Sequence, residues 1–145
     1  MRSVLQRVSS ASVEVDGEVV GSIHRGVLVL VACGHEDDVQ TARRMADKIA
    51  RMRIFPNTEG KMDLCLADAG GAALIVSQFT LLADTAKGRR PSFVGAAPPQ
   101  KAEPLINEVV AELRRVGLEV STGTFGAHMD VSLVNDGPVT FVIET

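Results

Sequence analysis

An uninterrupted apolar run, Val27–Val31, sets the tightest limit on how this chain can fold. Every side chain of the run is aliphatic, so the run has no polar face to turn toward water. Such a run predicts a strand that is buried on both faces. A second run, Ala73–Val76, has the same character and predicts another buried strand.

Other segments predict half-buried strands and tight turns. Residues 2–9 and 62–66 alternate between apolar and polar side chains, which is the period of a strand with one buried face. Asp16-Gly17 separates two valine-rich runs, 13–15 and 18–20. An Asp-Gly pair in this position is a strong signal for a two-residue hairpin loop.

Two further segments have the period of a helix. In residues 37–52 apolar side chains recur at helical spacing, and Asp37 and Asp38 are suited to the N-cap and the first turn. A second helix should contain Pro104 in its first turn and end at Gly117. We expect the inward face of this second helix to comprise Leu105, Ile106, Val109, Val110, Leu113 and Val116.

Many strands, several of them joined by hairpins, together with two helices favour an α+β fold over a doubly wound sheet. We expect a mainly antiparallel, barrel-like sheet with two amphipathic helices. The 145 residues are enough for one domain with a sizeable core, so we expect a single domain over residues 1–145. Trp and Tyr are absent, so that core must be largely aliphatic.

Charge and cysteine content restrict the function. The net charge of −3 gives no overall positive field for nucleic acid, so a polyanionic partner would have to be held by a local patch. Cys33 and Cys65 form no CxxC pair and no disulfide framework, which fits a reducing compartment. We find no signal-peptide core and no apolar run of membrane-spanning length, and we expect a cytoplasmic protein.

The first candidate for chemistry is Ser77-Gln78-Phe79-Thr80, which directly follows the buried run 73–76. Where the backbone leaves a sheet, its N–H groups could stabilise a developing oxyanion, and Thr80 could act as a nucleophile or a positioning hydroxyl. Alternatively, Ser77 and Thr80 only cap the strand end or pack as small β-formers.

The second candidate is Asn135-Asp136-Gly137-Pro138-Val139-Thr140, which lies between the apolar runs 131–134 and 141–143. The Gly-Pro dipeptide favours a hairpin turn between two edge strands. The bond before a proline can also be cis at modest cost, and Gly137 can approach another group closely. Backbone carbonyls around this turn could then point outward instead of into a ladder.

The remaining polar residues give weaker signals. Lys87, Arg89 and Arg90 lie on a long loop and could hold phosphates, or could form a solvated surface. His24, His35 and His128 lack metal-ligand spacing, and no glycine-rich phosphate loop follows a strand. We therefore expect no metal and no nucleotide cofactor. A nucleophilic Cys33 or Cys65 working with a histidine is a further alternative.

Together, residues 77–83 and 135–140 resemble the two signature motifs of the D-aminoacyl-tRNA deacylases. The resemblance covers essentially the whole chain and includes residues 4–8, 11–13, 60–62, 87–93, 97–99 and 131–138. It implies a homodimer that hydrolyses the ester between a D-amino acid and the 3′-terminal adenosine of tRNA. Members of this family use no metal or nucleotide cofactor.

The resemblance also implies roles for residues near the second motif. Gly137-Pro138, flanked by Asn135 and Val139, would be a cis dipeptide inserted into the pocket of the partner subunit. Its carbonyl oxygens would hold the α-amino group of the substrate, so that an L side chain would clash. Glycine, which has no side chain to reject, could be accepted.

In the first motif the resemblance implies a catalytic role for Ser77, Gln78, Phe79 and Thr80. Either Thr80 is a nucleophile, or the N–H groups of Phe79 and Thr80 bind the carbonyl oxygen while the 2′-hydroxyl of the RNA activates water. No general base adjoins Thr80 in the sequence, which favours the RNA-assisted version. We interpret Gln78 and Phe79 as pocket wall and adenine contacts.

The resemblance makes the basic loop, Lys87, Arg89 and Arg90, a candidate for contacts with tRNA phosphates. A protein of a different class would fit the same residues. A non-catalytic dimer that binds RNA or a small molecule could keep the pocket without turning over a substrate.

Overall fold

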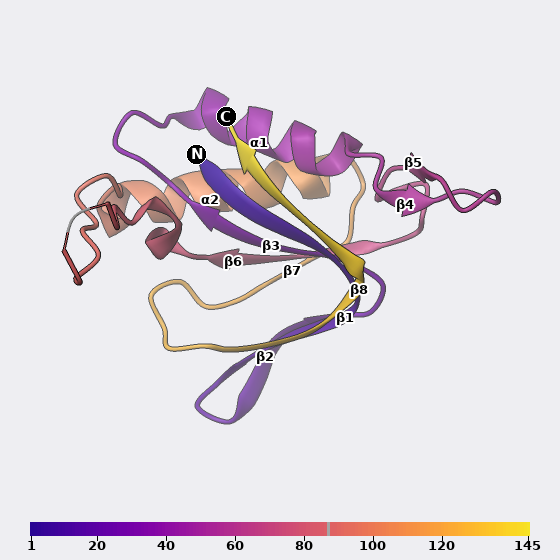
Figure 1. Cartoon of the computed structure of the whole chain (residues 1–145), viewed down its shortest axis with the longest axis horizontal. Helices are drawn as coiled ribbons and strands as arrows, with labels where there is room; N and C mark the ends of the chain where they lie inside the picture. The colour runs from indigo at the N-terminus through magenta and orange to yellow at the C-terminus, as the bar shows by residue number, and fades with distance from the viewer. Residues whose placement is uncertain (87) are drawn as a thin grey trace.

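The computed structural model describes residues 1–86 and 88–145 (Figure 1). Along the chain its elements are β1 (Arg2–Val15), β2 (Glu18–Ile23), β3 (Gly26–Ala32), α1 (Val39–Arg51), β4 (Phe55–Pro56), β5 (Met62–Leu64), β6 (Ala72–Ser77), the 3₁₀ turn η1 (Phe79–Leu82), α2 (Pro99–Arg115), β7 (Val120–Thr122) and β8 (Asp130–Glu144). Neither helix is long and apolar enough to cross a membrane, as far as the described residues go.

The long strand β1 organises the main sheet. Strand β8 pairs antiparallel with β1 over nearly its whole length, from Arg2 to Glu14. On its other edge β1 pairs antiparallel first with β3 and then with β2. β6 and β7 extend the sheet beyond β3 in parallel pairs, which is possible because a helix lies in each connection.

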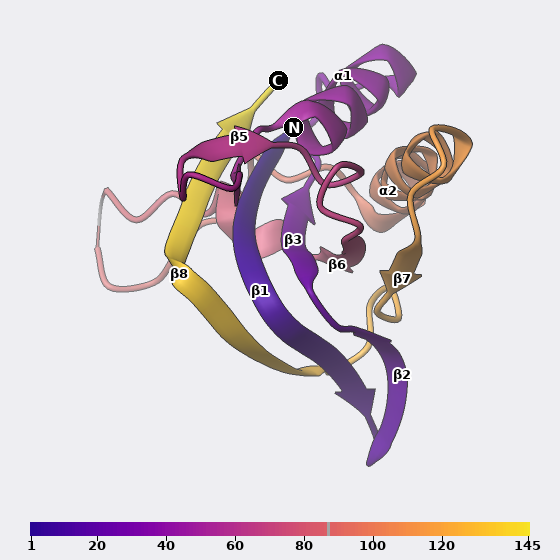
Figure 2. The ribbon, with the colours of Figure 1, turned by 90° about the vertical axis from the view of Figure 1, so that its right-hand side faces the viewer.

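The sheet curls until its ends nearly meet (Figure 2). The hydroxyl of Ser121 on β7 donates a hydrogen bond of 2.9 Å to the carbonyl oxygen of Ser22 on β2. Together with the two helices, this nearly closed sheet confirms the predicted α+β class and the barrel-like shape.

Two apolar cores account for the buried runs. One lies between the sheet and the helices, which cover the same face of the sheet (Figures 1 and 2), and includes Val29, Met45 and Leu113. The other fills the inside of the curled sheet and includes Leu28 and Leu74. Because neighbouring residues of β3 enter different cores, the prediction that this strand is buried on both faces is confirmed.

The Asp16-Gly17 turn, the N-cap of α1 and the end of α2 lie where the sequence predicts them. Asp16 and Gly17 have φ values of 51° and 83°, the double positive φ of the predicted two-residue hairpin loop. Asp38 is the N-cap of α1, where its Oδ1 accepts a hydrogen bond of 2.7 Å from the N–H of Thr41. Asp37 precedes the helix and takes no part in its first turn. Gly117 follows Val116, the C-cap of α2, as predicted.

Two details of α2 differ from expectation. The helix begins at Pro99, so Pro104 lies inside it and not in its first turn. A proline at the first helical position has a suitable φ and needs no N–H partner, which explains the earlier start. Val116 is 52% exposed and not inward, because it is the C-cap and lies past the last turn that packs on the sheet.

The hairpin predicted at Gly137-Pro138 is wrong. Both apolar flanks belong to the single strand β8 and pair with the same partner, β1. Asn135 pairs with Val8 and Thr140 pairs with Gln6, so residues 136–139 all lie opposite Arg7. The extra residues form a bulge instead of reversing the chain, because the ladder continues on both sides of them.

Candidate functional site

A cavity of about 570 Å³ opens where the parallel strands β3 and β6 end. Val31 and Ser77 are register partners at these strand ends, and both line the cavity. The remaining walls come from Phe93, Ala96 and Ala97, the first turns of α2, the loop 125–129 and Val131. Most lining side chains are apolar, and the polar exceptions are Ser77, Gln78 and His128.

Three of the four residues predicted in the first motif reach this cavity. Ser77 ends β6, and the backbone then turns into η1, with Gln78 as its N-cap. Ser77, Gln78 and Phe79 line the cavity, whereas Thr80 does not. The first N–H groups of η1, at Phe79 and Thr80, have no acceptor within the turn, so they can donate to another group.

The Thr80 hydroxyl is already engaged. The side-chain amide of Gln78 contacts Thr80 Oγ1, and Thr80 is exposed. Among the described residues, no histidine or carboxylate hydrogen-bonds to this hydroxyl. The geometry therefore gives Thr80 no protein base that would activate it as a nucleophile.

An exposed aromatic pair stands at the cavity. The rings of Phe79 and Phe93 meet edge to face, with 5.0 Å between their centroids, and both residues line the cavity. Such a pair presents apolar ring surface on which a flat group can stack. Sequence reasoning gave no role to Phe93. The available signal was an aromatic residue in a long loop of a chain with few aromatics.

Hydrogen bonds of the Asn135 side chain bridge the two ends of the bulge in β8. The side-chain oxygen of Asn135 accepts a hydrogen bond of 2.9 Å from the N–H of Val139. Its amide donates to Thr140 Oγ1 at 3.0 Å. Val139 is buried, whereas Gly137 and Pro138 are exposed. The peptide bond between Gly137 and Pro138 is cis.

Arg7 holds the bulge from the opposite strand. Its side chain is largely buried, and its Nε donates to the carbonyl oxygen of Asp136 at 3.1 Å and lies 3.2 Å from Asp136 Oδ2. Its Nη1 donates to the carbonyl oxygen of Ile54. Sequence reasoning missed Arg7, whose only signal was a charged residue in a run that is otherwise mostly buried.

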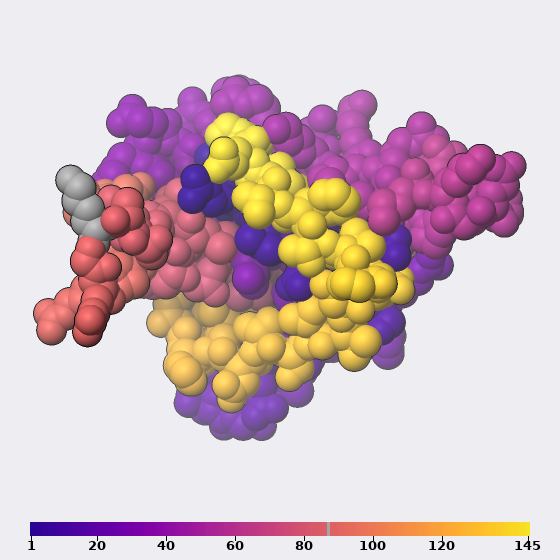
Figure 3. Space-filling view, viewed as in Figure 1, coloured from indigo at the N-terminus to yellow at the C-terminus, as the bar shows by residue number. Residues whose placement is uncertain are grey.

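Gly137 has no room for a side chain. It has a φ of +144°, and a Cβ built on it would lie 2.6 Å from Val139 Cγ2. Strand β8, drawn in yellow, lies at the surface on this face of the molecule (Figure 3). The exposed Gly137-Pro138 segment is therefore fixed in shape and accessible to another molecule.

The two motifs do not meet within one chain. Among the described residues, no hydrogen bond joins 77–80 to 135–140. In Figure 1 the segment that follows β6 lies at the left and the bend of β8 at the right. The cavity and the Gly137-Pro138 segment are thus separate features of the same subunit.

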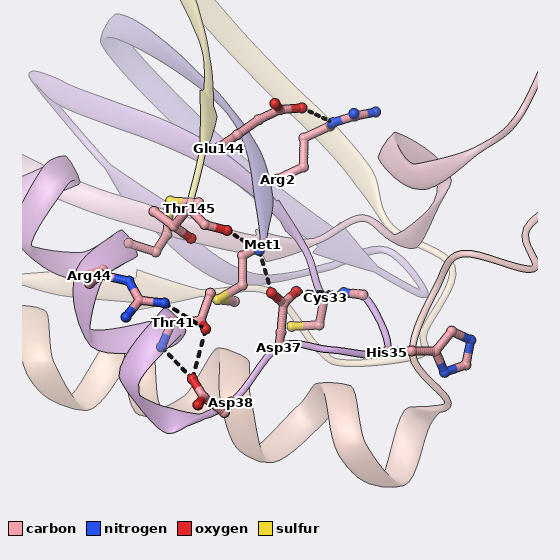
Figure 4. A network of polar contacts seen from close by, with 12 residues as sticks. Met1, Arg2, Cys33, His35, Asp37, Asp38, Thr41, Arg44, Glu144 and Thr145 are labelled. Atoms are coloured by element: carbon pink, nitrogen blue, oxygen red, sulfur yellow. Dashed lines mark hydrogen bonds and ion pairs between the residues drawn. The ribbon is translucent and has the colours of Figure 1, made fainter.

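A polar network anchors the loop beside the cavity (Figure 4). Asp37 Oδ1 pairs with the ammonium of Met1 at 2.6 Å. Asp37 Oδ2 accepts a hydrogen bond of 2.6 Å from the N–H of Gly34. These contacts fix residues 33–37 between β3 and α1, and Cys33 from this loop lines the cavity.

The thiol of Cys33 is unsuited to nucleophilic attack. Burial, with Asp37 nearby as the second cause, raises the pKa of this thiol to about 12. The thiolate is the reactive form, and a thiol with so high a pKa is almost entirely protonated at neutral pH. Cys65 lies outside the cavity lining.

The described histidines do not cluster, and the described basic residues of the loop lie apart from them. His128 lines the cavity, whereas His35 contacts the carbonyl oxygen of Val94 through Nε2 at 2.9 Å. Within the described ranges no group of three His, Cys, Asp or Glu residues could hold a metal ion. Arg89 and Arg90 are exposed on an excursion closed at its base by pairing of Asp84 with Ser92. Lys87 lies outside the described residues.

Two solved structures share this fold. A protein described as c-Myc DNA Unwinding Element Binding Protein has a TM-score of 0.94 and 39% identity, and the match covers 100% of this chain and 99% of that chain. A probable eukaryotic D-amino acid tRNA deacylase has a TM-score of 0.85 and 19% identity, with 99% and 98% of the chains covered.

Sequence comparison identifies the family. The D-aminoacyl-tRNA deacylase of Thermomicrobium roseum is 58% identical over 145 residues, which is 100% of this chain and 94% of the relative. The model of the D-Tyr-tRNA(Tyr) deacylase family matches residues 4–144. With both matches spanning nearly its whole length, this chain belongs to the D-Tyr-tRNA(Tyr) deacylase family.

Proposed function

We propose that this protein hydrolyses the ester that links a D-amino acid to the 3′-terminal adenosine of tRNA. Its family membership and the name of its relative from Thermomicrobium roseum support this reaction. The observation that carries the proposal is the apolar cavity at the end of β6, with Ser77, Gln78 and Phe79 in its wall. The reaction needs no metal or nucleotide cofactor, and we place it in the cytoplasm.

The Gly137-Pro138 segment selects the D substrate from a second subunit. It is exposed, held in shape by Arg7 and Asn135, and not in contact with the cavity of its own chain within the described residues. In a homodimer this segment enters the cavity of the partner. Its carbonyl oxygens accept hydrogen bonds from the α-ammonium group, so that the side chain of an L-amino acid meets backbone and is excluded. Asn135 and Val139, which flank the segment and are joined by a hydrogen bond, hold it in shape.

Hydrolysis then relies on positioning and on the RNA. The free N–H groups at Phe79 and Thr80 donate to the carbonyl oxygen as it gains negative charge. The 2′-hydroxyl of the terminal ribose takes part in activating a water molecule, because Thr80 has no base beside it. Water adds to the carbonyl carbon and the ester C–O bond breaks. The proton that the water loses passes to the departing 3′-oxygen, which leaves free amino acid and tRNA.

The adenosine occupies the aromatic side of the cavity. Phe79, with Phe93 at its edge, offers ring surface for the base, and Gln78 supplies a polar contact in the wall. Arg89 and Arg90 on the exposed loop are candidates for nearby phosphates, together with Lys87.

Hydrolysis of matched D-, L- and glycyl-tRNAs at equal enzyme concentration tests this function. We expect rapid loss of the D and glycyl esters while the L ester is spared. Equal loss of the D and L esters would mean a general esterase in which Gly137-Pro138 selects nothing. Binding of all three without turnover would favour the alternative of a non-catalytic RNA-binding dimer.

A further inference from the structure

A second, basic groove lies between residues 43–51 of α1 and the carboxyl-terminal end of α2, and it shares no lining residue with the cavity described above. Its volume is about 840 Å³, and small side chains such as Ala46 and Ala50 form part of its floor. Its charged lining consists of the cations Arg43, Arg44, Lys48, Arg51 and Arg115 and the carboxylates Asp47 and Glu112. A chain with a net charge of −3 thus has a local excess of positive charge here.

The carboxylates neutralise only part of this charge. Glu112, whose side chain is 16% exposed, pairs with Arg115 at 2.7 Å and with Arg43 at 3.5 Å. Arg43 also pairs with Glu108 at 2.7 Å. Asp47 pairs with Arg51 at 2.6 Å, and both of these side chains are exposed. The cations are therefore more exposed to solvent than Glu112, the acid that Arg43 and Arg115 share. The outer edge of the groove is positive as a result.

Two cations of the groove form no ion pair with a described residue. Arg44 donates to the hydroxyl of Thr41 at 3.1 Å, and Lys48 donates to the backbone carbonyl oxygen of Glu144 at 2.7 Å. Within the described part of the chain, no carboxylate forms an ion pair with either side chain. Both hydrogen-bond partners are neutral, so neither cation is neutralised by an ion pair with a described residue, and each can attract an anionic ligand. The Asp38 carboxylate interacts with the charge of Arg44 from beyond Thr41.

We propose that this groove, lined by Arg43, Arg44, Lys48, Arg51 and Arg115, binds the phosphate backbone of the tRNA body. The inference rests on the proposed function. If the 3′ end of a tRNA lies in the cavity, the rest of that large polyanion must cross the surface of an acidic protein. It will follow a positive path, and arginine side chains are well matched to phosphate oxygens.

The two sites are suitably spaced along one element. Ile106 on α2 lines the cavity, and Arg115 on the same helix lines the groove. At 1.5 Å per residue this separation along the helix is about 14 Å, roughly the axial length of a few nucleotides. A strand that leaves the cavity therefore reaches the groove after a short span, and the helix fixes the distance between them.

The test compares a groove variant with a control that loses the same charge elsewhere. The groove variant is Arg44→Gln with Lys48→Gln, which removes the two cations that form no ion pair among the described residues. The control is Arg53→Gln with Lys61→Gln, two exposed cations of the β4–β5 region outside the groove lining. Each protein is assayed on full-length D-aminoacyl-tRNA and on D-aminoacyl-adenosine, which has no RNA body.

For the groove variant we expect a KM for the tRNA substrate raised about tenfold, with kcat unchanged. The slope of log KM against log salt should fall by about two. Hydrolysis of D-aminoacyl-adenosine should stay at the rate of the unmodified protein, and the control should match that protein on both substrates. A groove variant with unchanged KM and salt slope would overturn the proposal.

Binding of uncharged tRNA, measured by fluorescence anisotropy, separates this proposal from the proposed function. If the unmodified protein hydrolyses neither ester, the function is wrong but the groove is still tested by binding. Weaker binding by the groove variant than by the control supports the groove. Equal binding by the two variants, or no RNA binding by the unmodified protein, rejects it.

Discussion

At the level of single residues, Thr80 is the clearest test of the chemistry. Its hydroxyl contacts Gln78 and has no base among the described residues, and Thr80 does not line the cavity. We therefore expect Thr80→Ala to keep kcat for D-aminoacyl-tRNA within about tenfold of the unmodified protein. Single-turnover kinetics would measure this. A loss of several orders of magnitude, with tRNA binding and fold intact, would make Thr80 the nucleophile.

Cys33 provides a second test at this scale. Because burial raises the pKa of its thiol to about 12, the folded protein should resist iodoacetamide at Cys33 at pH 7.5. Cys65 is half-exposed and outside the cavity, so its alkylation should leave hydrolysis unchanged. Mass spectrometry would identify the modified thiol, and the same sample would be assayed. Loss of activity in step with alkylation of either cysteine would support a cysteine hydrolase instead.

At the level of elements, the start of α1 depends on its cap. Asp38 accepts hydrogen bonds from the N–H and the hydroxyl of Thr41, which hold the pKa of its carboxyl below its ordinary value of 3.8. A carboxyl group whose pKa is lower in the folded than in the unfolded protein stabilises the fold at any pH above its unfolded-state pKa. This stabilisation is lost as the pH falls through the folded-state pKa.

Asp38→Ala should therefore lower the midpoint of thermal unfolding at pH 7, and the gap to the unmodified protein should narrow below pH 3.8. Circular dichroism melts across this pH range would measure the gap. Asp38→Asn, which retains a capping oxygen, is the matched control and should lose less at pH 7. A gap that is constant across the range would contradict a contribution from the charged cap.

The elements also show what sequence could and could not predict. The hairpin at Asp16-Gly17 and the cap of α1 depend on neighbouring residues, so local patterns predicted them. The bulge at Gly137-Pro138 depends on pairing with β1, more than a hundred residues earlier. A turn and a bulge share the same local signal, and only this distant partner distinguishes them.

The site divides in the same way. The end of β6 was predictable because a buried apolar run stops there and polar residues follow. Phe93 and His128 lie on loops without a regular period, and Arg7 lies on β1, so only the fold brings them to their places. The parallel pairing of β3 with β6, which sets the cavity, also depends on a long crossover that local patterns do not specify.

At the level of the whole molecule, the proposal requires one subunit to complete the site of another, and mixing two defective proteins tests this. Gly137→Val removes the selecting segment, because even a Cβ would lie 2.6 Å from Val139 Cγ2. Ser77→Trp fills the cavity, because Ser77 lines it. Dimers of Gly137→Val alone should not discriminate between D- and L-aminoacyl-tRNA. Dimers of Ser77→Trp alone should not hydrolyse either substrate.

After subunit exchange, half of the dimers should contain one subunit of each kind. In such a dimer one site combines both defects, while the other combines an intact cavity with an intact Gly137-Pro138 segment. D-specific hydrolysis should then recover to about a quarter of the unmodified value, because about one site in four is intact. If each chain supplied its own segment, every site would keep one defect. The mixture would then be no better than the average of its two parts, which an assay on D- and L-aminoacyl-tRNA would reveal.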